Sequence, residues 1–179
     1  MVYVFLANGF EETEALAPVD VLRRGGVEVK TVGVEGEYVT GSHGIIVKPD
    51  ITINDVLFTE IDMIVLPGGM PGTINLMSDD KVNKTIDYCT QNDKYVAAIC
   101  AAPMILGEKG LLDGKNAICF PGFEEHLKGA KLSDDKVIAD GKFITAKGAG
   151  VAIPFGLKLL ETLTNAEKSK EVAEAMQCL

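Results

Sequence analysis

The segment "YVAAICAAPMIL", residues 95–106, decides the fold prediction. Residues 96–99 form a short apolar and partly β-branched run, which is typical of a buried strand. Residues 101–107 favour a helix, and Pro103 fits its first turn because that position needs no N–H group. Cys100 is therefore expected where a buried strand meets a helix. Many α/β hydrolases carry their nucleophile at such a corner, between small residues.

Strand-like and helix-like segments alternate on both sides of this corner. Strands are predicted at residues 2–6, 27–34, 63–66, 96–99, 116–119, 137–139 and 142–145, and helices at 11–24, 81–91, 101–110, 149–163 and 166–176. Residues 38–40 and 45–47 predict a short hairpin. Repeated units of this kind predict an α/β fold with one domain over residues 1–179, in which a doubly wound, largely parallel sheet has helices on both faces. Ligands of such a sheet bind beyond the carboxyl ends of its strands, so the loops after residues 6, 66 and 99 are expected at one edge.

The composition limits the classes of partner. The chain has 179 residues, of which 47% are hydrophobic and 24% charged, which is typical of a soluble globular protein. A net charge of −9 argues against nucleic acid or an anionic membrane as a partner. The first residues lack the positive leader of a signal peptide, so a cytoplasmic protein with reduced thiols is expected. Four cysteines without a C-x-x-C pair and only two histidines predict no metal site, and no cofactor is expected.

The position of Cys100 predicts a reactive thiol. Backbone N–H groups at a helix N-terminus carry partial positive charge, which stabilises a thiolate and predicts a lowered pKa for Cys100. The alternative is a small apolar core residue at a tight turn. In "LPGGMPG", Gly68 and Gly69 allow a sharp turn that points backbone amides inward, as an oxyanion hole requires. Taken alone, this second motif favours a simple strand-to-helix turn.

Three carboxylates, Glu11, Glu12 and Glu14, follow the first predicted strand. Negative charge in a first helical turn complements the helix dipole, and this is the ordinary explanation for such a cluster. Helical spacing puts Glu11 and Glu14 near one face and turns Glu12 away. A buried carboxyl among them is expected to have a raised pKa, and in its neutral form it can donate a hydrogen bond to a thiolate or carry a proton.

Taken together and in order, the motifs resemble the ThiJ/PfpI superfamily, and within it the branch of the human parkinsonism-associated deglycase and its bacterial relatives. The motifs are "FLANGFEETEALAPVDVLRRGG", "DMIVLPGGMPG", "VAAICAAPMIL" and "FITAKGAGVAIPFGLKLLE", and the resemblance covers essentially the whole chain. It implies a flavodoxin-like fold and a homodimer. It also implies that Cys100 is the reactive cysteine and Glu14 its carboxyl partner. Gly69 and Ala101 would supply the oxyanion amides, with Gly68 in the same pocket.

The sequence departs from the family at two histidine positions. Some members place a histidine directly after the nucleophile, but Ala101 stands here, which excludes a general base from that position. Members of the deglycase branch often have a histidine before a proline on the next strand, where this chain has Phe120. His126 lies six residues further on and is a pocket candidate, with a solvated side chain as the alternative.

Two more pocket candidates rest on the resemblance. His43 matches a family position near the site and the dimer interface. Arg24 matches an arginine that reaches toward the pocket of the partner subunit, although a basic residue there also suits the C-terminus of its own helix.

The resemblance implies a cysteine-dependent enzyme that acts on reactive dicarbonyls, as a glutathione-independent glyoxalase of small aldehydes, or on their protein adducts, as a deglycase of glycated protein. The thiolate of Cys100 would attack an aldehyde carbon, and Glu14 would move a proton between adjacent carbons. The alternative is an oxidative-stress redox sensor in which Cys100 is oxidised to sulfinic acid without turnover. A holdase chaperone is a third possibility. Enzyme and sensor need the same cysteine and carboxyl, so the sequence leaves both open.

Overall fold

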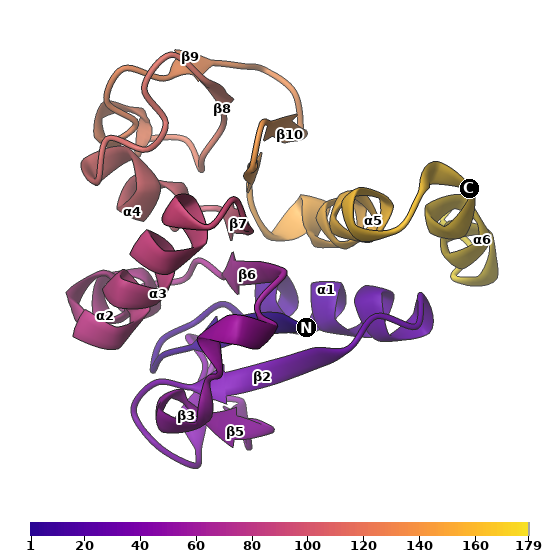
Figure 1. Ribbon diagram of the computed structural model, residues 1–179, viewed down its shortest axis with the longest axis horizontal. Coiled ribbons are helices and arrows are strands. Elements are labelled where there is room, and N and C mark those ends of the chain that lie inside the picture. The colour runs from indigo at the N-terminus through magenta and orange to yellow at the C-terminus, as the bar shows by residue number, and fades with distance from the viewer. Residues whose placement is uncertain (179) are drawn as a thin grey trace.

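The computed structural model describes residues 1–178 (Figure 1). It contains a seven-stranded sheet with the order β10-β11-β7-β6-β1-β2-β5. Its strands are β1 (Val2–Leu6), β2 (Val29–Gly33), β5 (Ile51–Thr52), β6 (Met63–Leu66), β7 (Tyr95–Ile99), β10 (Val137–Asp140) and β11 (Phe143–Ala146). Neighbouring strands pair in parallel, except that β10 is antiparallel to β11. The predicted α/β fold with a largely parallel sheet is confirmed.

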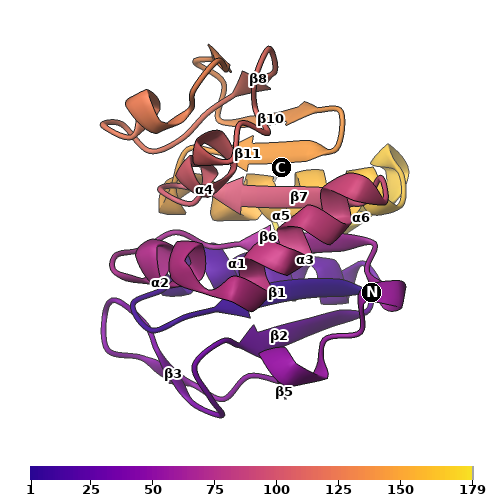
Figure 2. The same ribbon diagram turned by 60° about the vertical axis from the view of Figure 1, so that its left-hand side comes forward.

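Helices cover both faces of the sheet, with one set in front of the strands and the other behind them in Figure 2. The helices are α1 (Glu12–Arg24), α5 (Ala152–Leu163) and α6 (Ala166–Ala175) on one face, and α2 (Gly72–Ser78), α3 (Asp80–Gln91) and α4 (Pro103–Glu108) on the other. Helices α1 and α5 pack closely, since a Cβ on Gly156 would lie 3.0 Å from the Cα of Pro18. None of the helices in the described part of the chain is both long and apolar enough to cross a membrane.

The core lies in two layers, one on each side of the sheet. Val2 and Val4 of β1 pack against the layer that contains α1 and α5, whereas Tyr3 and Phe5 pack against the layer that contains α3 and α4. All four side chains are fully buried. Successive strand residues point to opposite faces, so a strand covered on both sides must be apolar at every position. This is why β1 and β6 are continuous apolar runs in the sequence.

Two small sheets lie outside the main one. β3 (Val39–Thr40) pairs with β4 (Ile46–Val47) as the predicted hairpin, and β8 (Asn116–Ala117) pairs with β9 (Lys131–Leu132). Single 3-10 turns occupy Ile53–Asp55, Phe58–Glu60, Glu124–His126 and Ala149–Val151. Neither α2 nor β5 was predicted from the sequence, because a glycine-rich run hides the start of α2 and β5 has only two residues.

The strand order reverses between β1 and β6, and the crevice at their carboxyl ends is the position where such folds bind ligands. The loop after β1 meets the loop after β6 at this edge. There the N–H of Glu11 donates a hydrogen bond of 2.9 Å to the carbonyl oxygen of Gly68. Cys100 directly follows β7, the next strand along. The predicted meeting of three loops at one edge is confirmed.

Candidate active site

Cys100 lies at the corner between β7 and α4, with its side chain partly exposed. Its φ of 65° is in the left-handed region, which residues other than glycine rarely adopt. Two backbone hydrogen bonds fix this corner: the N–H of Cys100 donates to Ala146 at 2.9 Å, and its carbonyl accepts from Phe120 at 2.8 Å. A sharp, strained turn that exposes a nucleophile is the geometry of a nucleophile elbow.

Glu14 places a buried carboxyl beside this thiol. Its side chain comes from the first turn of α1 and is 1% exposed. Its Oε2 accepts a hydrogen bond of 2.9 Å from the N–H of Gly68, and the carboxyl is also hydrogen-bonded to Cys100 and to the amide of Ala149. Burial raises the pKa of Glu14 to about 7, and the charge of Glu11 adds to this rise. Glu14 can therefore hold or release a proton near neutral pH.

The thiol of Cys100 does not have the lowered pKa predicted from its place before a helix. Burial raises its pKa to about 12, and the adjacent Glu14 carboxylate adds to the rise through its charge and by accepting a hydrogen bond from the thiol. The amides of Ala101 and Gly69 act in the opposite direction and are outweighed. Once Glu14 is protonated its charge is gone, and the neutral carboxyl can donate a hydrogen bond to a thiolate. Protonation of Glu14 therefore favours a thiolate at Cys100.

The two glycines leave room for this pair. A Cβ on Gly68 would lie 2.6 Å from the Cβ of Cys100 and 2.6 Å from Oε2 of Glu14. Gly69 has a φ of 87°, which favours glycine. The N–H groups of Gly69 and Ala101 are hydrogen-bonded to the Cys100 sulfur. Convergent amides beside a nucleophile are the arrangement that stabilises a negatively charged oxygen during acyl chemistry.

Two of the predicted pocket residues lie away from Cys100 within one chain. Nδ1 of His126 lies 2.8 Å from Oε1 of Glu108, at the end of α4 opposite to Cys100. Arg24 ends α1, where its Nε donates a hydrogen bond of 2.7 Å to Asp20. The reach of Arg24 toward a partner subunit stays a prediction.

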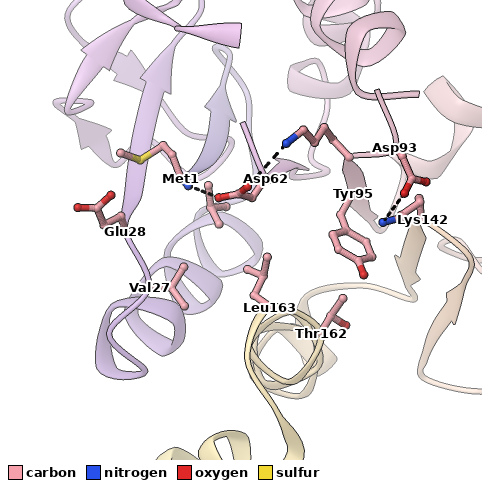
Figure 3. A pocket seen from close by; sticks show the side chains of 11 residues that line it. Met1, Val27, Glu28, Asp62, Asp93, Tyr95, Lys142, Thr162 and Leu163 are labelled. Atoms are coloured by element: carbon pink, nitrogen blue, oxygen red, sulfur yellow. Dashed lines mark hydrogen bonds and ion pairs between the residues drawn. The ribbon is translucent and has the colours of Figure 1, made fainter. Parts of the chain in front are cut away.

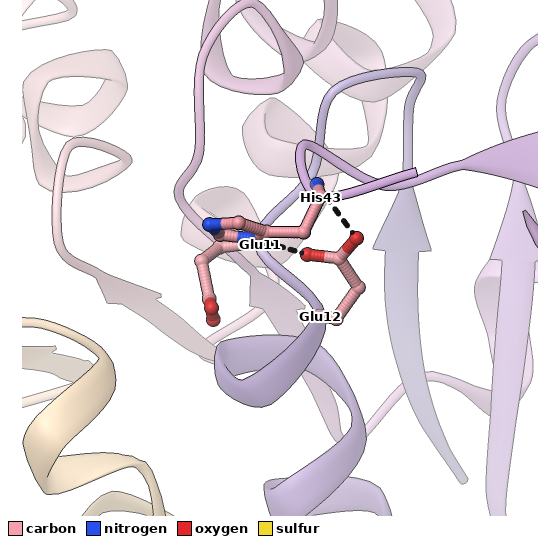
Figure 4. A group of neighbouring side chains, drawn as sticks. All are labelled: Glu11, Glu12 and His43. Atoms are coloured by element: carbon pink, nitrogen blue, oxygen red, sulfur yellow. Dashed lines mark hydrogen bonds and ion pairs between the residues drawn. The ribbon is translucent and has the colours of Figure 1, made fainter. Parts of the chain in front are cut away.

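His43, the third such candidate, is paired with Glu12 (Figure 4). Its Nδ1 lies 2.8 Å from Oε2 of Glu12, and its backbone N–H donates to Oε1 at 2.8 Å. Burial acts to raise the pKa of Glu12, but hydrogen bonds from the side chain of His43 and from backbone amides lower it to about 2. The predicted link between burial and a raised carboxyl pKa therefore holds for Glu14 and is wrong for Glu12, because Glu12 is surrounded by donors.

Glu11, Glu12 and His43 place three possible metal ligands within 4.8 Å of one another. The oxygens of Glu12 already accept hydrogen bonds from His43 and, at 3.4 Å, from the N–H of Ile45. Glu11 caps α1 by accepting the N–H of Glu14 at 2.6 Å. An ion would have to displace these donors. We therefore interpret the cluster as a clamp that holds the turn between β3 and β4 against the start of α1.

A different pocket opens at the amino ends of β1 and β7, away from Cys100 (Figure 3). Most of its charged groups are paired with one another: the N-terminal amine lies 2.5 Å from Asp62, and Lys142 lies 3.0 Å from Asp93. The lining contains no cysteine or histidine. This pocket brings together none of the residues predicted for catalysis.

The segment 147–151 belongs to the site and was not predicted from the sequence. It follows β11, whose carboxyl end lies at the same edge as that of β7. The amide of Ala149 reaches Glu14, and a Cβ on Gly148 would lie 3.9 Å from Oε1 of Glu14. The small residues of "AKGAG" directly after a strand are the signal that could have identified this segment.

Comparisons with known proteins identify the family of this chain. Residues 1–162 match the model of the DJ-1/PfpI family. The chain is 38% identical over 175 residues to Protein DJ-1 homolog B of Arabidopsis thaliana, covering 96% of this chain but only 40% of that longer protein. It is 32% identical to the glutathione-independent glyoxalase DJR-1.2 of Caenorhabditis elegans, covering 94% of this chain and 90% of that one. The structure of oxidized Toxoplasma gondii DJ-1 superposes with a TM-score of 0.93 at 36% identity, over 98% of this chain and 97% of that one. The chain belongs to the DJ-1/PfpI family.

Proposed function

We propose that this protein is a cysteine-dependent enzyme that converts small reactive dicarbonyls, or their adducts on protein, without glutathione. The observation that carries the proposal is the hydrogen-bonded pair of Cys100 and Glu14, in which the carboxyl has a pKa of about 7. The similarity to a named glutathione-independent glyoxalase supports the same reaction class. Glycated protein is the second substrate class, because its early adducts carry the same carbonyl-derived carbons.

The first step uses the thiolate of Cys100 beside protonated Glu14. The sulfur attacks the aldehyde carbon of an α-oxoaldehyde, a C–S bond forms, and the carbonyl π electrons move to oxygen. The amides of Gly69 and Ala101 stabilise the developing oxyanion. The proton of Glu14 then neutralises this oxygen, which gives a hemithioacetal and leaves Glu14 as a carboxylate.

The second step moves a proton between adjacent carbons. The Glu14 carboxylate removes the hydrogen from the carbon bonded to sulfur, which gives an enediolate. The hydroxyl proton on that carbon's oxygen moves to the former ketone oxygen, and Glu14 returns its proton to the former ketone carbon. The first carbon is thereby oxidised to a thioester and the second is reduced to an alcohol, so no external oxidant is needed. Water then hydrolyses the thioester to a 2-hydroxy acid and regenerates the thiol. A carboxyl that titrates near pH 7 suits both halves of this transfer.

A homodimer is part of the proposal. Tyr38, Ile45 and Ile46, in and beside the β3–β4 hairpin, are 63%, 55% and 65% exposed. Exposed apolar side chains clustered on one hairpin support association with a second copy of the chain. Light scattering coupled to size-exclusion chromatography should give twice the chain mass. The double substitution Ile45→Lys and Ile46→Lys should give the mass of a single chain.

A second candidate is a redox sensor, which the partial exposure of Cys100 favours. Peroxide would transfer one oxygen atom to the thiolate, releasing hydroxide, and a second equivalent would give a sulfinate and water. Protonated Glu14 and the amides of Gly69 and Ala101 would donate hydrogen bonds to this group. This function needs no proton transfer to carbon.

The deciding measurement is lactate formation from methylglyoxal in the absence of glutathione. The wild type, Cys100→Ser and the control Cys178→Ser are compared at equal concentration. Turnover in the wild type and the control, lost in Cys100→Ser, is the expected result. Absence of turnover in the wild type would overturn the enzymatic proposal. The mass of the Cys100 peptide after exposure to peroxide would then test the sensor.

A further inference from the structure

An apolar pocket of about 360 Å³ opens beside the Cys100–Glu14 pair, lined by Phe120, Pro121 and residues 147–151. Phe120 is 47% exposed. An aromatic ring exposed to this extent beside a nucleophile is available for contact with a bound molecule.

The walls of the pocket are fixed to the two reactive residues. The N–H of Phe120 donates a hydrogen bond of 2.8 Å to the carbonyl of Cys100. Next to the ring, a Cβ on Gly148 would lie 3.2 Å from Phe120 and 3.9 Å from Oε1 of Glu14. The amide of Ala149 is hydrogen-bonded to the same carboxyl. The lining therefore adjoins both reactive residues, Cys100 through Phe120 and Glu14 through Gly148 and Ala149.

The lining suits a nonpolar group. Lys147 is its one charged residue and is exposed, whereas Pro121, Ala149 and Val151 offer carbon surface. Gly148 lets the Phe120 ring pack closely against the backbone, and Gly150 has open space where a side chain would stand. A nonpolar group gains free energy by leaving water for such a surface, and an aromatic group also gains from stacking with Phe120.

We propose that this pocket binds the nonpolar substituent of the carbonyl substrate, and that Phe120 selects aryl and larger alkyl oxoaldehydes over the methyl compound. The substrate named here rests on the proposed function, but the pocket itself can be tested without turnover. Iodoacetamide and its N-benzyl derivative both alkylate thiols, and they differ by an aromatic group of the size that the pocket would hold. Cys178 is exposed in the same chain and serves as the internal reference for each reagent.

The test measures alkylation of Cys100 relative to Cys178 by peptide mass spectrometry. The N-benzyl reagent should favour Cys100 about tenfold more than iodoacetamide does, because hydrophobic pockets discriminate by factors of this order. Phe120→Ala should remove most of this preference, and Val151→Phe should reduce it by filling the opposite wall. Leu132→Ala, which shortens an exposed side chain in β9, is the matched control and should retain it. Equal preference for the two reagents in the wild type, or an unchanged preference in Phe120→Ala, would overturn the proposal.

Turnover separates this inference from the proposed function. In the wild type, kcat/KM for phenylglyoxal should exceed that for methylglyoxal, and Phe120→Ala should reverse this order. A benzyl preference at Cys100 without turnover of either aldehyde would overturn the proposed enzymatic function and support the proposed binding pocket. Turnover of both aldehydes without a benzyl preference would overturn the proposed binding pocket and support the enzymatic function.

Discussion

The carboxyl of Glu14 is held by a residue that must lack a side chain. Its Oε2 accepts the N–H of Gly68 at 2.9 Å, and a Cβ on Gly68 would lie only 2.6 Å from that same oxygen. The donor can approach the carboxyl and the thiol together only because it is a glycine. The loop after β6 therefore fixes the distance between the Glu14 carboxyl and the Cys100 sulfur.

Gly68→Ala should abolish turnover while leaving the protein folded. The added methyl group would collide with the Cβ of Cys100 and with Glu14, so the pair must separate. We expect kcat/KM for methylglyoxal to fall at least about a hundredfold, because proton transfer by a positioned group contributes on this scale. Steady-state kinetics and far-UV circular dichroism measure the two outcomes.

The matched control for this substitution is Gly110→Ala. Gly110 has a φ of 70°, and a Cβ there would meet nothing within 4 Å. The Gly110→Ala substitution should lower the free energy of unfolding by about 1 kcal/mol through backbone strain and leave turnover unchanged. Equal losses of activity in both variants would mean that instability, and not a collision at the site, explains the effect.

Glu14 should make the protein less stable as the pH rises through neutrality. Its folded pKa of about 7 lies above the ordinary 4.5, so the folded protein binds the proton more tightly than the unfolded chain does. The stabilisation is complete below about pH 4.5 and is lost as the pH rises through about 7. Urea unfolding should show that, between pH 5 and pH 8, the free energy of unfolding of the wild type falls by up to about 3 kcal/mol more than that of Glu14→Gln. Parallel losses in the two proteins would contradict this assignment.

Glu14→Gln and Glu14→Leu should separate proton transfer from hydrogen bonding. Both lack a carboxyl, so both should lose at least about a hundredfold in turnover of methylglyoxal. The glutamine amide can still donate a hydrogen bond to a thiolate, whereas leucine cannot. Alkylation of Cys100 by iodoacetamide, measured relative to Cys178, should therefore be faster in Glu14→Gln than in Glu14→Leu. Equal rates would show that the thiolate needs no donor from this position.

The fold could be predicted from the sequence because its strands are continuous apolar runs that end in glycines or small residues. Such a run as "DMIVLPGG" carries both the buried strand and the turn that follows it. The corner at Cys100 follows from the same pattern. The pKa values could not be predicted, because they depend on partners distant in sequence. Glu12 and Glu14 are two residues apart, yet one faces donors near residue 43 and the other a thiol at residue 100.

Glu12→Gln should weaken the attachment of the β3–β4 turn to α1. The carboxylate accepts the side chain and the backbone N–H of His43, and its pKa of about 2 lies below the ordinary 4.5. Its stabilisation is therefore present above about pH 4.5 and is lost as the pH falls through about 2. Glu12→Gln should lower the free energy of unfolding by about 1–3 kcal/mol at pH 7, and its difference from wild type should become smaller toward pH 3.

Urea unfolding at pH 7 and pH 3 measures this difference, and Glu37→Gln, at an exposed position, is the control. A difference that is the same at both pH values would contradict a role for the charge.

The strain at Cys100 predicts an unusual order of stabilities. With a φ of 65°, Cys100→Ala keeps a Cβ in the left-handed region, where it crowds the backbone, whereas Cys100→Gly removes it. Cys100→Gly should therefore be more stable than Cys100→Ala by about 1 kcal/mol in urea unfolding. At Ala98, an ordinary buried position in β7, the glycine variant should instead be less stable than the alanine of the wild type. If the glycine form were less stable than the alanine form at both positions, the corner at Cys100 would store no strain. Opposite signs would show that the fold tolerates strain in order to hold the thiol at the mouth of the site, which a cysteine kept only for packing would not require.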